Sequence, residues 1–219
     1  MIPYANEKGI FVISPTVSDD SYNAHDDLFF RVNASSSEYG TYLAQRAVQG
    51  FGVKRPMLVG DERNARYKDI IFDSFKRELV SLGGNVAKSV SFYSNLPLPT
   101  DEIIDGITES SADAVVLVTA SISDMEYSGD SARSFLNDYR AAYGVAPSFT
   151  AVFGWETASI LRRVFASAAN ADPVTLKKEL LNIGTFDGVE EPIVFDRSGD
   201  ASRTLFLYTI DHGRFKRLE

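Results

Sequence analysis

The feature that most constrains this chain of 219 residues is an alternation of short apolar runs with longer segments of helical periodicity, repeated from one end to the other. Short apolar runs between turn residues are typical of buried strands, whereas apolar side chains at every third or fourth position indicate helices. Strands that alternate with helices form βαβ units around a mainly parallel sheet. The pattern therefore predicts an α/β fold with parallel sheets flanked by helices.

Turn and capping residues place the first elements along the chain. Residues 9–14 (GIFVIS) form an apolar run that Pro15 stops, and a second short apolar segment covers residues 28–32. Ser35 and Glu38 then have the spacing of a capping box, in which two side chains satisfy free N–H groups at the start of a helix. The sequence thus predicts two strands followed by a helix.

Two further strand and helix pairs follow. Residues 57–60 indicate a strand, and the next helix is marked by an apolar stripe made of Ile71, Phe75, Leu79 and Leu82. A half-buried strand is expected at residues 86–92, before a helix whose N-cap is predicted to be Thr100.

The second half contains the most apolar run of the chain, residues 113–120 (DAVVLVTA). Because it shows no polar alternation, it predicts a central parallel strand covered by helices on both faces. Residues 121–131 are polar and predict a loop. A long helix follows, with an expected core stripe of Trp155, Ala158, Leu161, Phe165 and Ala168. At the end, residues 193–195 and 205–210 flank several turn residues and predict a C-terminal β-hairpin.

Composition excludes several classes of function. A net charge of -8 argues against nucleic acid, since phosphate binding needs clustered Lys and Arg. The chain has no cysteine, and its two histidines, His25 and His212, stand far apart in loop-like positions, so a metal site is not expected. Neither a nucleophile elbow nor a phosphate-binding glycine loop is present. We therefore predict a protein that is not an enzyme and that needs no cofactor.

Candidate binding residues follow the first predicted strand. Thr16 and Ser18 are hydroxyl residues in a loop after a buried strand, and ligands of open α/β sheets bind outside the carboxyl ends of strands. Hydroxyls beside free backbone N–H groups suit a small carboxylate or ammonium group. An ordinary Ser/Thr turn explains the same residues equally well. Tyr67 and Trp155 are aromatic candidates for an apolar wall, although such side chains are more often part of a core.

Six segments, in order, resemble the type I periplasmic binding proteins of the leucine/isoleucine/valine-binding kind, the solute receptors of ABC transporters. The matching segments are GIFVISPTVS, DDLFFRVNASSSEYGTYLA, VGDERNARYKDIIFDSFKRELVSLGGNV, SADAVVLVTA, SFLNDYRAAYGVAPSFTAVFGWETASIL and FDGVEEPIVFDRSGDASRTLFLYTIDHGRF. The resemblance covers nearly the whole chain. It implies two α/β lobes joined by a hinge, with an amino acid or similar small solute bound between them.

The resemblance also implies roles for particular residues. Thr16 and Ser18 match the loop residues that bind the α-carboxylate and α-ammonium of the ligand from the first lobe, and Tyr67 matches a tyrosine of the second lobe. Trp155, with Glu156 after it, replaces a Tyr-Asp pair. With Ser121, which follows the apolar run, these residues form the predicted ligand-binding set.

The chain also departs from the family pattern. The opening units of the first lobe have no counterpart, and neither do two βα units after residue 120. We expect a partial first lobe at residues 1–52, a second lobe at 53–145, and crossover helices with the hairpin at 146–219. Exposed strand edges would then favour a homodimer or a missing partner segment.

The resemblance finally implies partners and a location. An ABC permease or a sensor is the expected protein partner, and an amino-acid-like molecule the ligand. A periplasmic or extracellular location is implied, although the N-terminus MIPYANEKGIF does not resemble a signal peptide. The alternative is a ligand-sensing or interaction domain of a receptor that keeps the fold and has lost part of the pocket.

Overall fold

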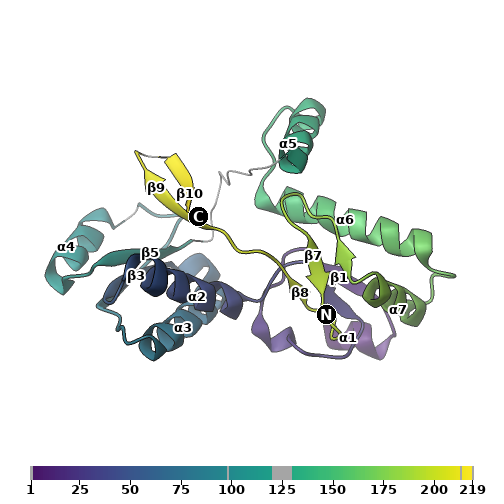
Figure 1. Cartoon of the computed structure of the whole chain (residues 1–219), viewed down its shortest axis with the longest axis horizontal. Helices are drawn as coiled ribbons and strands as arrows, with labels where there is room; N and C mark the ends of the chain where they lie inside the picture. The colour runs from purple at the N-terminus through teal and green to yellow at the C-terminus, as the bar shows by residue number, and fades with distance from the viewer. Residues whose placement is uncertain (1, 98, 120–129, 213, 219) are drawn as a thin grey trace. The chain divides into compact units, whose positions relative to one another are not determined.

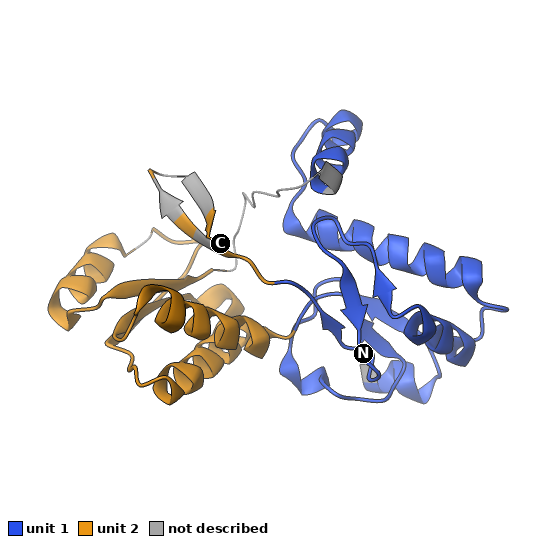
Figure 2. Ribbon diagram, viewed as in Figure 1, with its two compact units in different colours: residues 1–34, 123–204 blue, residues 35–122, 205–219 orange. Residues whose placement is uncertain are grey.

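The computed structural model describes residues 2–97, 99–119, 130–212 and 214–218. By its internal contacts the chain forms two compact units, shown in Figure 2. Unit 1 comprises residues 1–34 and 123–204, and unit 2 comprises residues 35–122 and 205–219. The chain therefore passes between the units three times. Both units combine parallel strands with helices, which confirms the predicted α/β class (Figure 1).

These units divide the chain differently from the expected limits at residues 52 and 145. Residues 35–52 belong to unit 2, because their helix packs against the helix of residues 65–81. Residues 146–204 belong to unit 1. Hydrophobic packing between segments that are distant in sequence decides this division, and glycine and proline positions do not reveal it.

Unit 2 is built on a three-stranded parallel sheet. The central strand β3 (Pro56–Asp61) lies between β4 (Lys88–Phe92) and β5 (Ala114–Val118). One face packs against α2 (Ser36–Gln45), which continues as a π-helical turn (Arg46–Gly50), and against α3 (Ala65–Ser81). The other face packs against α4 (Thr100–Ser110). A short 3₁₀ turn (Glu62–Asn64) links β3 to α3.

The start and the packing of α2 follow from single residues. Glu38 accepts a hydrogen bond from the backbone N of Ser35 at 3.2 Å, so the predicted capping box is formed. Gly40 then permits close approach to α3, because a Cβ there would stand 2.3 Å from the carbonyl O of Ile71 and 2.0 Å from Oγ of Ser74. Thr100, in contrast, is the first residue of α4, and the N-cap is Pro99.

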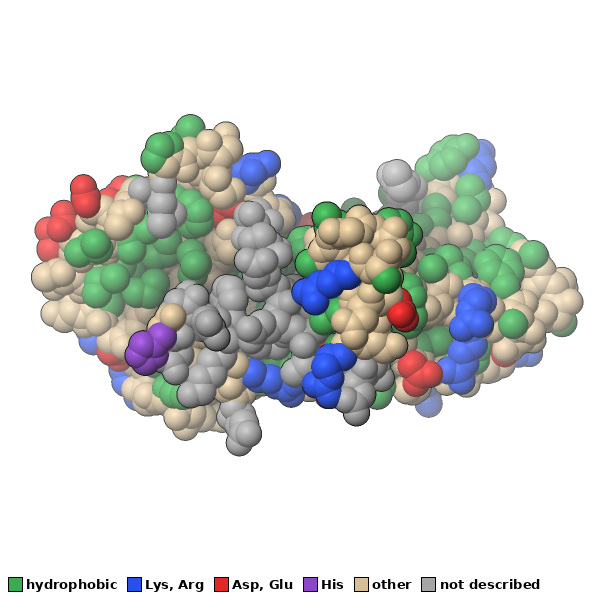
Figure 3. Space-filling view, turned by 90° about the horizontal axis from the view of Figure 1, so that it is seen from above, with side chains coloured by type: hydrophobic (Ala, Val, Ile, Leu, Met, Phe, Trp, Pro, Cys, Tyr) green, Lys and Arg blue, Asp and Glu red, His purple; other side chains and the backbone are tan. Residues whose placement is uncertain are grey.

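The apolar run predicted to be a central strand is an edge strand in the described part of the sheet. β5 pairs with β3 alone, and its residues Val115 and Leu117 lie opposite Met57 and Val59. Met57 and Val59 are buried under α4, whereas Val115 and Leu117 are 45% and 54% exposed. Helices therefore do not cover both faces of β5. Figure 3 shows hydrophobic side chains gathered on this face of unit 2.

Unit 1 contains two small sheets. β1 (Val12–Ser14) and β2 (Phe29–Arg31) are parallel, and β6 (Thr185–Phe186), β7 (Ile193–Phe195) and β8 (Ala201–Ser202) form an antiparallel sheet. A bridge between Arg31 and Asp200 links the two sheets. The helical segments of this unit are α1 (Ile2–Glu7), a 3₁₀ turn (Asp20–Tyr22), α5 (Asp130–Tyr143), α6 (Phe149–Ser167) and α7 (Pro173–Ile183).

The core of unit 1 uses a different face of α6 from the one predicted. Its buried apolar residues are Ile160 and Val164, which pack with Phe30 and Leu180, and Val152, which packs in a separate cluster with Phe135. Trp155 and Phe165 of the predicted stripe are 46% and 51% exposed. Both stripes have helical spacing, so periodicity could not choose between them. The buried face also carries the fully buried Glu156, which accepts hydrogen bonds from Arg203.

The predicted C-terminal hairpin pairs different strands. β7 turns through residues 196–200 and pairs with β8, whereas β9 (Leu207–Asp211) pairs with β10 (Arg214–Leu218) in unit 2. The chain passes between the units after residue 204, which separates the two hairpins. Among the described residues, no helix is long and apolar enough to span a membrane.

Candidate functional site

The predicted solute loop of unit 1 follows β1 directly. Pro15 and Thr16 form a bend after the strand, Thr16 is exposed, and Ser18 is half-buried. The hydroxyl of Ser14 accepts a hydrogen bond from the backbone N of Val17 at 3.3 Å, which shapes the bend. The loop thus lies at the carboxyl end of a parallel strand, where open α/β sheets bind ligands.

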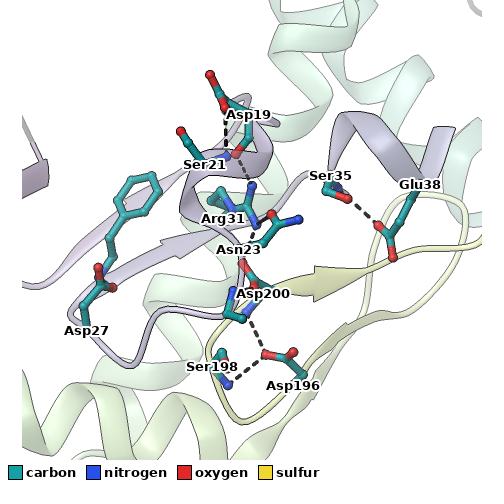
Figure 4. Close-up of polar contacts among 12 residues, drawn as sticks. Asp19, Ser21, Asn23, Asp27, Arg31, Ser35, Glu38, Asp196, Ser198 and Asp200 are labelled. Atoms are coloured by element: carbon teal, nitrogen blue, oxygen red, sulfur yellow. Dashed lines mark hydrogen bonds and ion pairs between the residues drawn. The ribbon is translucent and has the colours of Figure 1, made fainter. Parts of the chain in front are cut away.

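A buried arginine positions the far end of this loop, as Figure 4 shows. Arg31, 1% exposed, donates through Nη1 to the carbonyl O of Asp19 at 3.0 Å and through Nη2 to Oδ1 of Asn23 at 2.6 Å. Nη2 also donates to Asp200 in an ion pair. Asp200 accepts from the backbone N of Ala24 at 2.7 Å. One guanidinium therefore connects β2, the loop and the start of β8.

The turn that carries Asp200 is itself tightly organised. Oδ1 of Asp196 accepts from the backbone N of Ser198 at 2.9 Å and from that of Asp200 at 3.0 Å. Gly199 has a φ of +86°, and a Cβ there would stand 2.5 Å from the ring of Phe30. The turn thus requires glycine, both for its left-handed backbone and for its contact with the core.

Unit 2 places a second polar cluster at the carboxyl end of β3. Asp61, 1% exposed, accepts hydrogen bonds through Oδ1 from the backbone N of Arg63 at 3.0 Å and from that of Ser94, after β4, at 3.1 Å. This carboxylate thus joins the ends of two neighbouring strands.

Charged residues flank Tyr67 on the same turn. Lys68 is buried and forms ion pairs with Glu62 and, at 3.1 Å, with Asp69. The hydrogen bond from Lys68, with a second from Ser91, lowers the pKa of Glu62. Burial alone would lower the pKa of Lys68, but its hydrogen bonds to Glu62 and Asp69 outweigh burial and raise it.

Tyr67 lies in the first turn of α3, half-buried against the hydrophobic core of unit 2. Burial raises the pKa of its hydroxyl. A tyrosine hydroxyl is protonated at neutral pH even without this shift, so the group can donate a hydrogen bond. An apolar ring with a protonated hydroxyl suits contact with a small polar ligand.

The remaining predicted residues do not join these clusters. Trp155 lies on α6 and contacts the ring of Phe135, with 5.3 Å between the ring centroids. Ser121 lies outside the described residues. Thr16, Ser18 and Trp155 belong to unit 1 and Tyr67 to unit 2, so their shared role in binding stays a prediction.

Two arginine ion pairs of unit 1, those of Arg31 and Arg203, are not among the residues predicted from the sequence. Arg31 interrupts the apolar segment 28–32. A charged residue within a buried strand indicates an ion pair, since Arg is rarely buried without a partner. Arg203 gave no comparable signal, since its partner Glu156 is distant in sequence. Across the described part of the chain, no three His, Cys, Asp or Glu side chains are grouped so that they could bind a metal ion.

Two α/β units connected by three chain crossings carry polar loops after parallel strands, the position at which open α/β sheets bind ligands. The family model described as periplasmic binding protein matches residues 87–214, more than half of the chain. The chain therefore belongs to the periplasmic binding protein family. No curated protein sequence matches it.

Solved structures of this kind share the fold at low sequence identity. A leucine-binding protein from Thermotoga maritima is 17% identical with a TM-score of 0.78, and the match covers 100% of this chain and 75% of that one. An ABC transporter solute-binding protein from R. palustris, in complex with benzoate, is 16% identical with a TM-score of 0.78, covering 100% and 72%. A branched-chain amino acid ABC transporter ligand-binding protein from Burkholderia xenovorans is 14% identical with a TM-score of 0.81, covering 99% and 72%. The predicted resemblance to type I periplasmic binding proteins is thus confirmed.

Proposed function

We propose that this chain binds a small carboxylate-bearing solute, of the amino-acid kind, outside the cytoplasm and delivers it to an ABC permease. The observation that carries the proposal is the hydroxyl loop of Thr16 and Ser18 at the carboxyl end of β1, which Arg31 connects to the sheet. Family membership supports it. The similar structures include proteins described with leucine and with benzoate, both of which carry a carboxylate.

In this proposal the residues recognise a solute and perform no reaction. Thr16 and Ser18 donate hydrogen bonds to the carboxylate of the solute from unit 1. Tyr67 contributes a protonated hydroxyl from unit 2. Hydrogen bonds to charged groups are stronger than neutral ones, so a few such contacts can orient a small anion. No covalent step is required, and the protein is not an enzyme.

Calorimetry with a panel of L-amino acids and small aromatic carboxylates, benzoate included, tests the proposal. Replacing both Thr16→Ala and Ser18→Ala should weaken binding about a hundredfold or more, because each of the two lost hydrogen bonds to a charged group costs about 1.5–3 kcal/mol. Ser21→Ala is the matched control, since Ser21 lies in the same loop and bonds to Asp19 through its backbone N. Absence of heat for every solute would contradict the proposal.

A second candidate function is an interaction domain that keeps the fold and has lost part of the pocket. The exposed Val115 and Leu117 on the edge strand β5 favour it, because proteins usually cover such edges. Light scattering at micromolar concentration separates the candidates. A homodimer that is silent toward the solute panel supports the interaction domain, and a monomer that binds a solute supports transport.

A further inference from the structure

The most completely buried charge of unit 1 has no part in the solute loop. Glu156, 0% exposed, accepts hydrogen bonds at Oε2 from Nη1 of Arg203 at 2.7 Å and at Oε1 from Nη2 of Arg203 at 2.9 Å. Oε1 also accepts from the backbone N of Val189 at 2.8 Å. The guanidinium of Arg203 lies over the ring of Phe153, 4.8 Å from its centroid. The pair is therefore bidentate, largely desolvated and supported on several sides.

Arg203 lies close to a point at which the chain passes from one unit to the other. Arg203 lies one residue before the end of unit 1 at residue 204, where the chain passes to unit 2. Its Nη1 also donates to the carbonyl O of Val32 at 3.4 Å, and Val32 lies two residues before the passage at residue 34. One side chain thus contacts the segments that lead into two of the three crossings. The third crossing, after residue 122, lies outside the described residues.

We infer that Glu156 and Arg203 form a hinge anchor, a pair of positioning residues that fixes two crossing segments to unit 1. Because Glu156 lies on the rigid helix α6, the pair binds both segments to one body. Hinge motion is absorbed by a few residues at element ends, so fixing those ends limits the range of positions that the two units can adopt. The inference goes beyond solute binding and can be tested without a ligand.

The chain has no cysteine, so two introduced cysteines give one unambiguous pair of spin labels. Arg162→Cys on α6 and Arg77→Cys on α3 are exposed positions in different units. Pulsed dipolar spectroscopy on this double variant then reports the distribution of distances between the units. The width of that distribution is the readout, since a purely stabilising contact inside unit 1 would not change it.

Arg203→Met and Glu156→Gln should broaden the distribution about twofold, because segments freed from buried contacts sample more conformations. Arg203→Lys should broaden it to a smaller extent, since one ammonium cannot replace the planar fork that reaches both oxygens of Glu156 and Val32. Leu180→Ala is the matched control, because it removes a fully buried side chain of the same core away from the crossings.

Far-UV circular dichroism shows whether each variant is folded. If Arg203→Met does not fold, the distance distribution of Arg203→Lys is used in its place. The anchor is supported if Arg203→Lys broadens the distribution and Leu180→Ala leaves it unchanged. It is overturned if folded Arg203→Lys keeps the width of the parent protein. Equal broadening by Leu180→Ala would also overturn it, because general loosening of unit 1 would then explain the effect.

Discussion

The buried guanidinium of Arg31 and the partly exposed carboxylate of Asp200 form an ion pair between residues 169 positions apart. The pair joins the end of β2 to the start of β8, and Asp200 also accepts from the backbone N of Ala24. Through Asp19 and Asn23 the same arginine reaches back to the loop that carries Thr16 and Ser18. A contact between two sheets therefore shapes the proposed solute loop.

Asp200→Ala should lower the free energy of unfolding by about 3 kcal/mol, because it leaves the charge of Arg31 buried with an incomplete set of partners. Urea unfolding followed by circular dichroism measures the change. Asp187→Ala is the control, since Asp187 is exposed. Equal losses in the two variants would show that this ion pair contributes no more than a surface charge.

Gly40→Ala should destabilise unit 2 by about 1–3 kcal/mol, because the new methyl group would clash with the backbone carbonyl of Ile71. The paired helices α2 and α3 would have to move apart. Gly50→Ala is the control, since nothing lies within 4 Å of a Cβ at that position. Thermal unfolding should show a lower midpoint for Gly40→Ala alone, and an unchanged midpoint would contradict the close packing.

Unit 2 should be less stable in acid, because the ion pair of Glu62 and Lys68 is lost when Glu62 is protonated. The pKa of Glu62 is lowered from 4.5 by the hydrogen bond from Lys68, so its stabilising effect is present above 4.5 and is lost as the pH falls through the lowered value. The pKa of Lys68 is raised from 10.5, so its effect is present below 10.5 and is lost at higher pH. The pair therefore stabilises the fold at neutral pH.

Glu62→Gln tests this pH dependence through the urea midpoint of unfolding. The difference from the parent protein should be largest near neutral pH and should shrink as the pH falls below 4.5. Glu109→Gln is the control, because the pair of Glu109 with Lys88 is exposed and longer, at 3.5 Å. A difference that stays constant with pH would contradict the assignment.

Trp155 is the only tryptophan of the chain, and its side chain is 46% exposed. Its fluorescence should therefore be quenched by iodide, and Phe135→Ala should increase quenching by removing the ring in contact with it. A bound solute that reduces quenching in the parent protein would support Trp155 as a binding residue. Complete protection without any solute would show that the indole is buried.

Local sequence was sufficient to predict several elements. The capping box of Ser35 and Glu38 depends on neighbouring residues alone, and it is present in the structure. The class of fold could likewise be predicted, since the alternation of strand and helix patterns is a property of the chain itself. Six ordered motifs also indicated the family, which the match over residues 87–214 confirms.

Tertiary packing decided which faces of the helices and strands are buried, a question that the local sequence pattern left open. Two faces of α6 have helical spacing, and the buried face is the one that includes Val152, Ile160 and Glu156, the partner of Arg203. β5 is as apolar as a central strand, yet among the described strands it pairs with β3 alone. Local periodicity determines which elements form, whereas contacts between distant residues determine which faces are buried, because burial depends on what the rest of the chain brings near.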